Sequence, residues 1–127
     1  MDKHFKNIIF LDTYNQQKPQ MNISDVEKLE QAIEVHGYRG PSKKKHNGVV
    51  PIRPTDNQLW KALDKYKELE SDKIELLINN GNEHIADVKI VAHVTTGDRA
   101  IGCVYKNNSD DLTLCVLGFA NYNKKLF

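Results

Sequence analysis

The sequence predicts an α+β fold: an antiparallel sheet of about four strands with helices packed on one face. Three observations predict it: one apolar segment near the N-terminus, two segments with helical periodicity, and three apolar segments near the C-terminus separated by short polar turns. The 127 residues, 39% hydrophobic and 28% charged, suit one globular domain spanning residues 1–127. In the order strand, helix, helix and three strands, both helices bury their apolar sides most simply on one sheet face, which leaves the other for water or a ligand.

The N-terminal part supplies the first strand and the first helix. Residues 6–14, KNIIFLDTY, are rich in β-branched and aromatic side chains and predict a strand, after which a loop is expected. Ser24 and Glu27 have the spacing of a capping box, in which each side chain bonds the other's backbone amide. We therefore expect a helix over residues 25–36 that ends in a left-handed Gly37.

A long basic loop is expected at about residues 37–55. Its Pro and Gly residues exclude a long helix, although GVVPI is compatible with a short extended piece. No acid stands between Glu34 and Asp56, and the basic residues and histidines of this gap are His36, Arg39, Lys43, Lys44, Lys45, His46 and Arg53. On a chain of net charge +1, such a patch can bind phosphate or can be a solvated loop.

The second helix and three strands follow this loop. Thr55 and Gln58 repeat the capping-box pattern and predict a helix that ends near residues 69–71. Residues 73–80 fit either a short helix or one arm of a hairpin, and the absence of alternation in IELLI favours the helix. DVKIVAHVT, RAIGCVY and LTLCVLGF predict an antiparallel meander whose open face carries Lys89, Val91, His93 and Thr95.

The sequence shows none of the local motifs that hold a metal, a cofactor or a nucleotide phosphate. It has no Cys-x-x-Cys, His-x-x-x-His or Asp-x-Asp motif, and GYRGPSKKKHNG lacks the spacing of a phosphate-binding loop. We therefore expect no metal and no cofactor. Cys103 and Cys115 are expected in the core as reduced thiols of a cytoplasmic protein, because the sequence shows neither a signal peptide nor an apolar run that could span a membrane.

Three side chains are candidates for acid–base chemistry or anion binding. His46 lies among lysines, which disfavour its charged form and would leave it able to accept a proton; the alternative is a solvent-exposed loop histidine. His93 is a second candidate, or a strand-surface residue without a role. Arg99 opens a strand after a tight turn and offers donors that suit a phosphate; the alternative is a salt bridge with Asp98 or Asp111.

The element order and the C-terminal text GDRAIGCVYKNNSDDLTLCVLGFANYNKKLF resemble the RelE/ParE toxin superfamily of bacterial toxin–antitoxin modules. In that family an Arg opens a strand ending in an aromatic residue, a polar turn and an apolar strand follow, and a terminal segment brings aromatic and basic residues beside the open sheet face. The resemblance covers residues 87–127 by pattern and the rest by element order. It implies an endoribonuclease that binds messenger RNA on this face, usually on the ribosome, with a cognate antitoxin as protein partner.

We therefore hypothesise a metal-independent endoribonuclease toxin in which the RNA 2′-hydroxyl attacks the adjacent phosphate. A base, His46 or Tyr122, takes the proton, while Arg99 and Lys124 stabilise the phosphorane charge. The expected RNA-binding residues are Lys43, Lys44, Lys45, Arg53, His93, Lys125 and Phe127. The alternative is a small non-catalytic binding protein, an immunity or regulatory partner, that docks its basic loop on an acidic protein surface.

Overall fold

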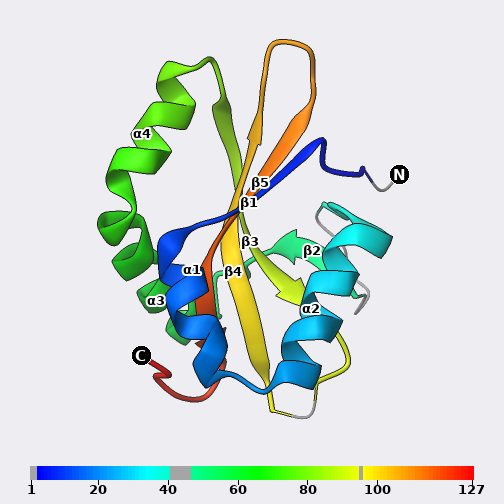
Figure 1. The fold of residues 1–127 in the computed structure, drawn as a ribbon, viewed down its shortest axis with the longest axis vertical. Coiled ribbons are helices and arrows are strands. Elements are labelled where there is room, and N and C mark those ends of the chain that lie inside the picture. The colour runs from blue at the N-terminus through cyan, green and yellow to red at the C-terminus, as the bar shows by residue number, and fades with distance from the viewer. Residues whose placement is uncertain (1–2, 41–46, 95) are drawn as a thin grey trace.

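The computed structural model describes residues 3–40, 47–94 and 96–127, and it confirms the α+β class. A mostly antiparallel open sheet of five strands has the order β1-β5-β4-β3-β2 (Figure 1). The strands are β1 (Asn7–Phe10), β2 (Gly48–Pro51), β3 (Glu83–Val91), β4 (Asp98–Lys106) and β5 (Leu112–Asn121). β3, β4 and β5 form the predicted antiparallel meander.

The edge strand β1 differs from the prediction, whereas β2 coincides with the short extended piece that GVVPI allowed. β1 is only four residues long and pairs in parallel with β5, because a helix begins at Asp12 inside the segment predicted as strand. β2 lies in the segment predicted as a long loop and pairs antiparallel with β3. The bridges Lys3–Tyr38 and Tyr38–Val49 continue the pairing from β2 to the residues before β1.

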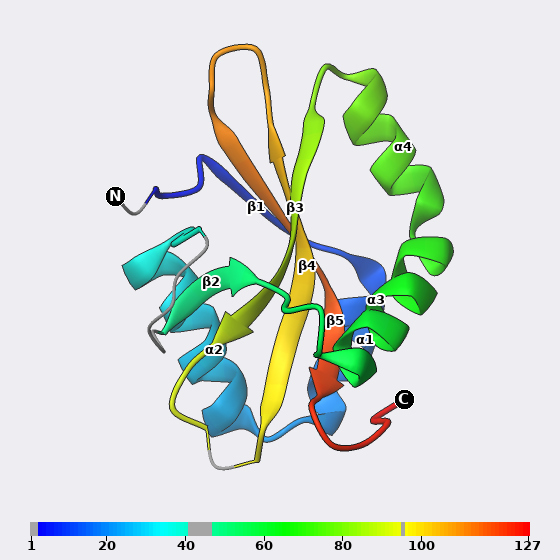
Figure 2. The same cartoon turned by 180° about the vertical axis from the view of Figure 1, so that it is seen from behind.

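Helices cover both faces of the sheet, which corrects the prediction of one covered face. α2 (Ile23–His36) packs on one face, here called the α2 face, and α3 (Asn57–Leu69) and α4 (Ser71–Asn79) lie on the other, the α3 face (Figures 1 and 2). α4 confirms the helix favoured for residues 73–80. The short α1 (Asp12–Gln17) and the 3-10 turn Lys18–Gln20 replace the loop predicted after the first strand.

Two helix starts also differ from the capping-box predictions. Asn22, not Ser24, is the N-cap of α2, and its side-chain Oδ1 accepts the Asp25 N–H at 3.1 Å. Asp56, not Thr55, occupies the N-cap position of α3, without a side-chain capping bond. Gly37 ends α2 with φ of 62° and ψ of −154°, so the positive φ expected of a terminal glycine is present, but the backbone is not in the left-handed helical region.

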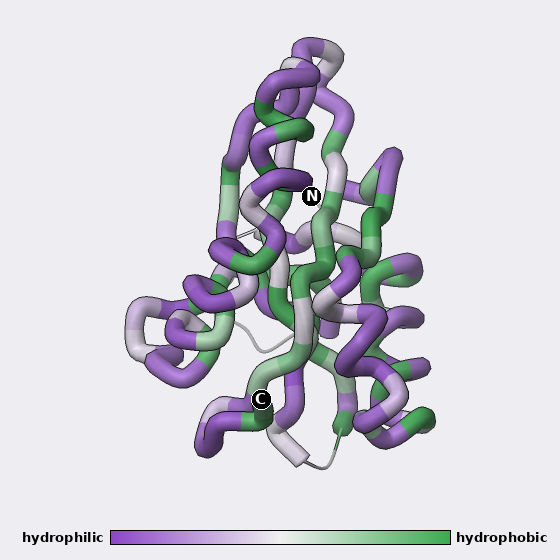
Figure 3. The backbone as a smooth tube through the Cα atoms, turned by 60° about the vertical axis from the view of Figure 1, so that its left-hand side comes forward, coloured by the Kyte–Doolittle hydropathy of each residue, from purple (hydrophilic) through white to green (hydrophobic). Residues whose placement is uncertain are grey.

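The sheet separates two apolar clusters, because alternate strand residues point to opposite faces. The α2-face cluster joins strand residues to helix α2 and includes Val26, Leu29, Ile33, Val88, Ile90, Val104, Leu114 and Phe119. The α3-face cluster joins the same strands to helix α3 and includes Leu59, Leu63, Tyr66, Ile101, Cys103, Cys115 and Leu117. Figure 3 shows hydrophobic strands in the interior and hydrophilic stretches along the outer helices. A sheet that is apolar on both sides needs a cover on both sides.

Side chains complete the outer edge of β5 where β1 has ended. Gln17 Oε1 accepts the Phe119 N–H at 2.8 Å, and the Tyr66 hydroxyl donates to the Phe119 carbonyl at 2.6 Å. Gly118 makes room for both, since a Cβ there would lie 2.7 Å from Gln17 Oε1 and from the Tyr66 ring. One residue of β5 thereby holds α1 and α3 in place.

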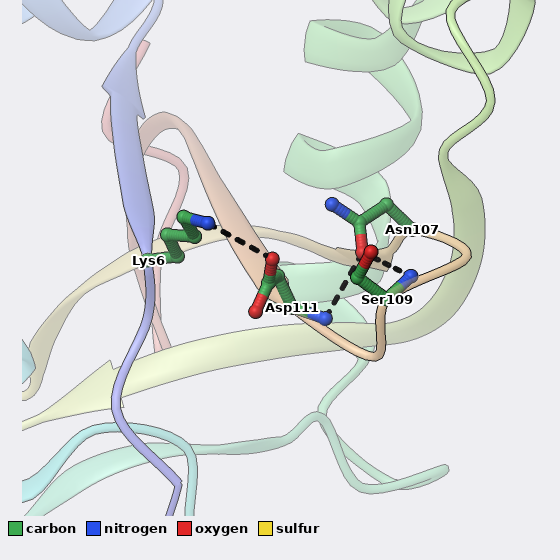
Figure 4. A network of polar contacts seen from close by, with 4 residues as sticks. All are labelled: Lys6, Asn107, Ser109 and Asp111. Atoms are coloured by element: carbon green, nitrogen blue, oxygen red, sulfur yellow. Dashed lines mark hydrogen bonds and ion pairs between the residues drawn. The ribbon is translucent and has the colours of Figure 1, made fainter.

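The turn between β4 and β5 is held by its own side chains (Figure 4). Asn107 Oδ1 accepts the backbone N–H groups of Ser109 at 2.9 Å and Asp111 at 3.0 Å. Lys6, just before β1, reaches the Asp111 carboxylate at 3.1 Å. This turn is therefore linked to the parallel edge strand.

None of the helices among the described residues has the length and apolarity that crossing a membrane requires.

Removing either side-chain partner of Phe119 should destabilise the fold. Gln17→Leu leaves a buried N–H without an acceptor, and Tyr66→Phe leaves the carbonyl without its donor. Each should lower the free energy of unfolding by about 1–3 kcal/mol, the cost of an unsatisfied buried polar group. Urea denaturation measures this, with the exposed Gln16→Leu as the control for the change in side-chain type. If Gln17→Leu were as stable as Gln16→Leu, the edge-capping role would be wrong.

The two buried thiols should make the fold less stable at alkaline pH. Burial raises the pKa of Cys115 to about 12 and also raises the pKa of Cys103. Because an ordinary thiol has a pKa of about 8.5, the unfolded chain loses these protons first, so stability is full below about pH 8.5 and falls as the pH rises above it. Urea denaturation should show a smaller alkaline loss for Cys115→Ala than for the parent chain. Equal losses would contradict the assignment.

Candidate functional site

A buried ion pair lies at the end of the sheet on the α3 face. Lys89 Nζ is 2.7 Å from Asp56 Oδ2, and the two side chains are only 7% and 12% exposed. The same Asp56 oxygen accepts the Arg53 backbone N–H at 3.0 Å. Lys89 was predicted on an open face, but α3 and the residues before it cover that position. The pair joins β3 to the start of α3.

Tyr122 packs against two cations beside this pair. Its ring centroid lies 4.9 Å from Lys89 Nζ and 4.8 Å from the Arg99 guanidinium carbon. Such cation–π contacts fix the direction of the arginine while leaving its donors available. The structure thus brings together two of the four predicted catalytic residues, Arg99 and Tyr122.

Neither acid considered as a salt-bridge partner for Arg99 takes that role. Arg99 Nη1 donates to the backbone carbonyl of Asp98 at 2.7 Å, while the Asp98 carboxylate accepts from Asn121 Nδ2 at 2.7 Å. Asp111 pairs with Lys6 at the other end of β4. Arg99 Nε is buried without a hydrogen-bond partner among the described residues. The guanidinium therefore retains donors for an anion.

Arg99 lines a pocket of about 480 Å³, here called the corner pocket. The other lining residues lie at the end of α2, in the segment after it, just before β2, and at and after the end of β3: His36, Arg39, Asn47, Val91, Ala92, His93 and Val94. Arg39 Nη1 lies 3.2 Å from His36 Nδ1 and donates to the Asn47 carbonyl at 3.0 Å. No described lining residue is acidic, so the Arg99 guanidinium favours an anion in this pocket.

A second basic pocket, the tail pocket, lies between α3 and the C-terminal residues and has a volume of about 230 Å³. Its charged lining residues are Lys61, Lys65, Lys124 and Lys125, and Phe127 contributes to its apolar part. Lys65 Nζ also donates to the Phe127 carbonyl at 3.3 Å. The predicted pair of Lys124 and Arg99 is therefore divided between two pockets.

The other predicted residues fall into three groups. His93 shares the corner pocket with Arg99, and Lys125 and Phe127 line the tail pocket. Arg53 lies before α3 and lines neither pocket; its backbone bonds Asp56 and Trp60. His46, Lys43, Lys44 and Lys45 lie outside the described residues.

Sequence reasoning missed four basic residues of these pockets. His36 and Arg39 belong to the basic segment but are not among the predicted site residues, and neither Lys61 nor Lys65 is among the residues considered from the sequence. The spacing of the two lysines was a usable signal, because residues four apart lie on the same helix face.

No protein-family model, curated protein or solved structure was found to match this chain. Its function is therefore argued from its own geometry.

Replacing only one partner of the buried Lys89–Asp56 pair should destabilise the fold more than replacing both partners. Lys89→Met leaves the Asp56 carboxylate buried without its cation, and the expected loss is about 3–5 kcal/mol of unfolding free energy. The double variant Lys89→Met/Asp56→Asn keeps an acceptor for Arg53 and carries no buried charge, so it should be more stable than the single variant. Thermal and urea denaturation test this order. A double variant less stable than Lys89→Met would contradict it.

Proposed function

We propose that this protein is an endoribonuclease that binds a phosphate of single-stranded RNA in the corner pocket. The observation that carries the proposal is the convergence of Arg99, His93 and His36, from three separate segments, on one pocket without a described acid. An arginine fork suits a phosphate, and imidazoles are the side chains best able to move protons near neutral pH. The resemblance to RelE-type toxins in the C-terminal strands agrees with this chemistry.

The reaction requires a base, an acid and a stabiliser of negative charge. The RNA 2′-oxygen forms a bond to the adjacent phosphorus as His93 takes its proton, and the bond from phosphorus to the 5′-oxygen breaks. The leaving oxygen takes its proton from solvent water, because His36 Nδ1 accepts from Arg39 Nη1 at 3.2 Å and the ring is therefore neutral, without an acidic proton to give. Arg99 would neutralise the charge that develops on the phosphoryl oxygens. His93 replaces His46 as the proposed base because it lines the same pocket as Arg99.

Tyr122 and the tail pocket have supporting roles in this proposal. Tyr122 holds Arg99 through its ring at 4.8 Å, so it acts as a positioning residue rather than as the base. Lys124 and Lys125 would bind the RNA backbone at a second point. Their pocket is also lined by Asn121, whose side chain bonds Asp98, the residue before Arg99. Lysines act as flexible point charges, which suits backbone attraction more than orientation of the reacting phosphate.

Substitutions in the corner pocket should separate cleavage from binding. Arg99→Gln and His93→Gln should each lower cleavage of a short single-stranded RNA by about 100-fold or more, as the loss of a charge stabiliser or proton carrier does. RNA binding should change little, because lysines outside the pocket supply much of the attraction. The measurements are cleavage with and without ribosomes, binding by fluorescence anisotropy, and growth arrest after induced expression.

Two matched variants control for the loss of a histidine or a positive charge. His4→Gln and Lys106→Gln change residues outside both pockets and should leave cleavage unchanged. If the parent chain neither cuts RNA nor arrests growth, the enzyme proposal fails. If it does both and Arg99→Gln is fully active, the activity stands and the assignment of the site is wrong.

A second candidate is a non-catalytic partner that docks on an acidic protein surface. The division of Lys124 and Arg99 between two pockets favours it, because a binding protein can distribute its charges whereas a catalytic site must gather them. Absence of cleavage together with salt-sensitive binding to an acidic protein would support this candidate.

A further inference from the structure

A cluster of three metal-ligating side chain types lies on the α3 face, outside both basic pockets. His84 Nε2 is 2.8 Å and Cys103 Sγ is 3.3 Å from Asp87 Oδ1, and the ligand atoms of all three residues lie within 4.8 Å of one another. His84 and Asp87 are on β3, and Cys103 is directly opposite Asp87 on β4. The cluster was invisible to motif searching because its ligands come from two strands.

A β-bulge places the histidine in this cluster. In β3, His84 pairs with Tyr105 and Ala86 pairs with Val104, so Ile85 is the extra residue and is 40% exposed. In a regular strand, residues 84 and 87 would point to opposite faces. The bulge turns His84 to the side of Asp87, and bulges that re-aim a side chain are frequent next to functional sites.

We propose that His84, Asp87 and Cys103 bind a divalent transition-metal ion, with Zn²⁺ as the ion that fits the donor set best. Imidazole nitrogen, carboxylate oxygen and thiolate sulfur are its three usual donors, and three protein ligands leave one position for water. Tetrahedral bonds of about 2.0–2.3 Å place ligand atoms roughly 3.3–3.8 Å apart, so binding an ion requires His84 Nε2 and Asp87 Oδ1, now 2.8 Å apart, to separate by about half an ångström. His84 has a side chain that is 40% exposed, which gives an ion access from solvent.

Without an ion, Asp87 is held by three donors. Lys67 Nζ lies 2.7 Å from the same Oδ1 atom that His84 and Cys103 contact. Burial alone would raise the pKa of Asp87, but the hydrogen bonds from Lys67 and His84 outweigh it and hold the pKa below its usual value. Lys67 is therefore the competitor that an ion must displace.

The exchange balances in charge and protons. A bound Zn²⁺ replaces Lys67 as the cation beside Asp87. The Lys67 side chain, which is 33% exposed, can then turn towards solvent. The Cys103 thiol releases one proton to solvent on becoming a thiolate, and His84 binds through Nε2 with its proton on Nδ1. The ion would cross-link β3 to β4 and hold the bulge, which is a structural role independent of the proposed RNA chemistry.

The test is metal binding to the purified chain after chelation. Co²⁺ should produce a thiolate-to-metal charge-transfer band with d–d bands of tetrahedral coordination, and Zn²⁺ should abolish them and raise the melting temperature. Cys103→Ala should weaken binding by at least about 100-fold, the upper range for loss of an outer-shell partner. Cys115→Ala is the matched control, because Cys115 is a buried thiol opposite Cys103 but outside the cluster.

Lys67→Met separates a metal site from a purely structural hydrogen-bond network. If the cluster is a metal site, Lys67→Met should bind Co²⁺ about two- to fivefold more tightly than the parent chain, because the competing ammonium is gone. This factor corresponds to the strength of a partly exposed ion pair. A network alone should show no Co²⁺ bands in the parent chain or in Lys67→Met. Absence of these bands, or equal affinity in Cys103→Ala and Cys115→Ala, would overturn the proposal.

Discussion

The buried pair of Lys89 and Asp56 is the interaction on which the arrangement of the candidate site depends. Two charges taken out of water are tolerated only when they satisfy each other, so the pair allows little freedom to the elements that carry it. One partner is on β3 and the other begins α3. The same lysine touches the Tyr122 ring, and that ring touches Arg99. The start of α3 is thereby coupled to the direction of the Arg99 side chain.

This coupling limits where a ligand can bind. α3 and α4 cover the sheet face that the resemblance to RelE-type toxins predicted to be open. The apolar α3-face cluster beneath them includes Leu59 and Tyr105. What stays accessible is the end of the sheet, where His93 follows β3, Arg99 lies at the start of β4 and both line one pocket. A phosphate would be bound at this corner by side chains at the strand ends. The flat middle of the sheet serves as core.

The sequence predicted elements well where a single periodicity decided them. The three C-terminal strands and α2 followed from apolar runs, helical spacing and turn chemistry, whereas α4 was favoured over a hairpin arm only because IELLI does not alternate. Tertiary context decided the rest. α1 has six residues without an apolar stripe, and the hydrogen bond from the Phe119 N–H of β5 to Gln17 holds it in place. Asp56 is fixed by its ion pair with Lys89 rather than by a capping bond. Neither contact can be derived from local patterns, because the partners are far apart in the chain.

The grouping of the predicted site residues in space depends on the same long-range contacts, and residue type foresaw it only in part. Arg99 and His93 were chosen for residue type and strand position, and the fold places both in one pocket. Lys124 was chosen by analogy and lies in another pocket, because the chain turns after Asn121, whose side chain bonds Asp98 and the Thr96 carbonyl. The bulge at Ile85 changes the face of His84 in a way that strict alternation cannot foresee. Register, more than residue identity, therefore decides which polar side chains of this sheet meet.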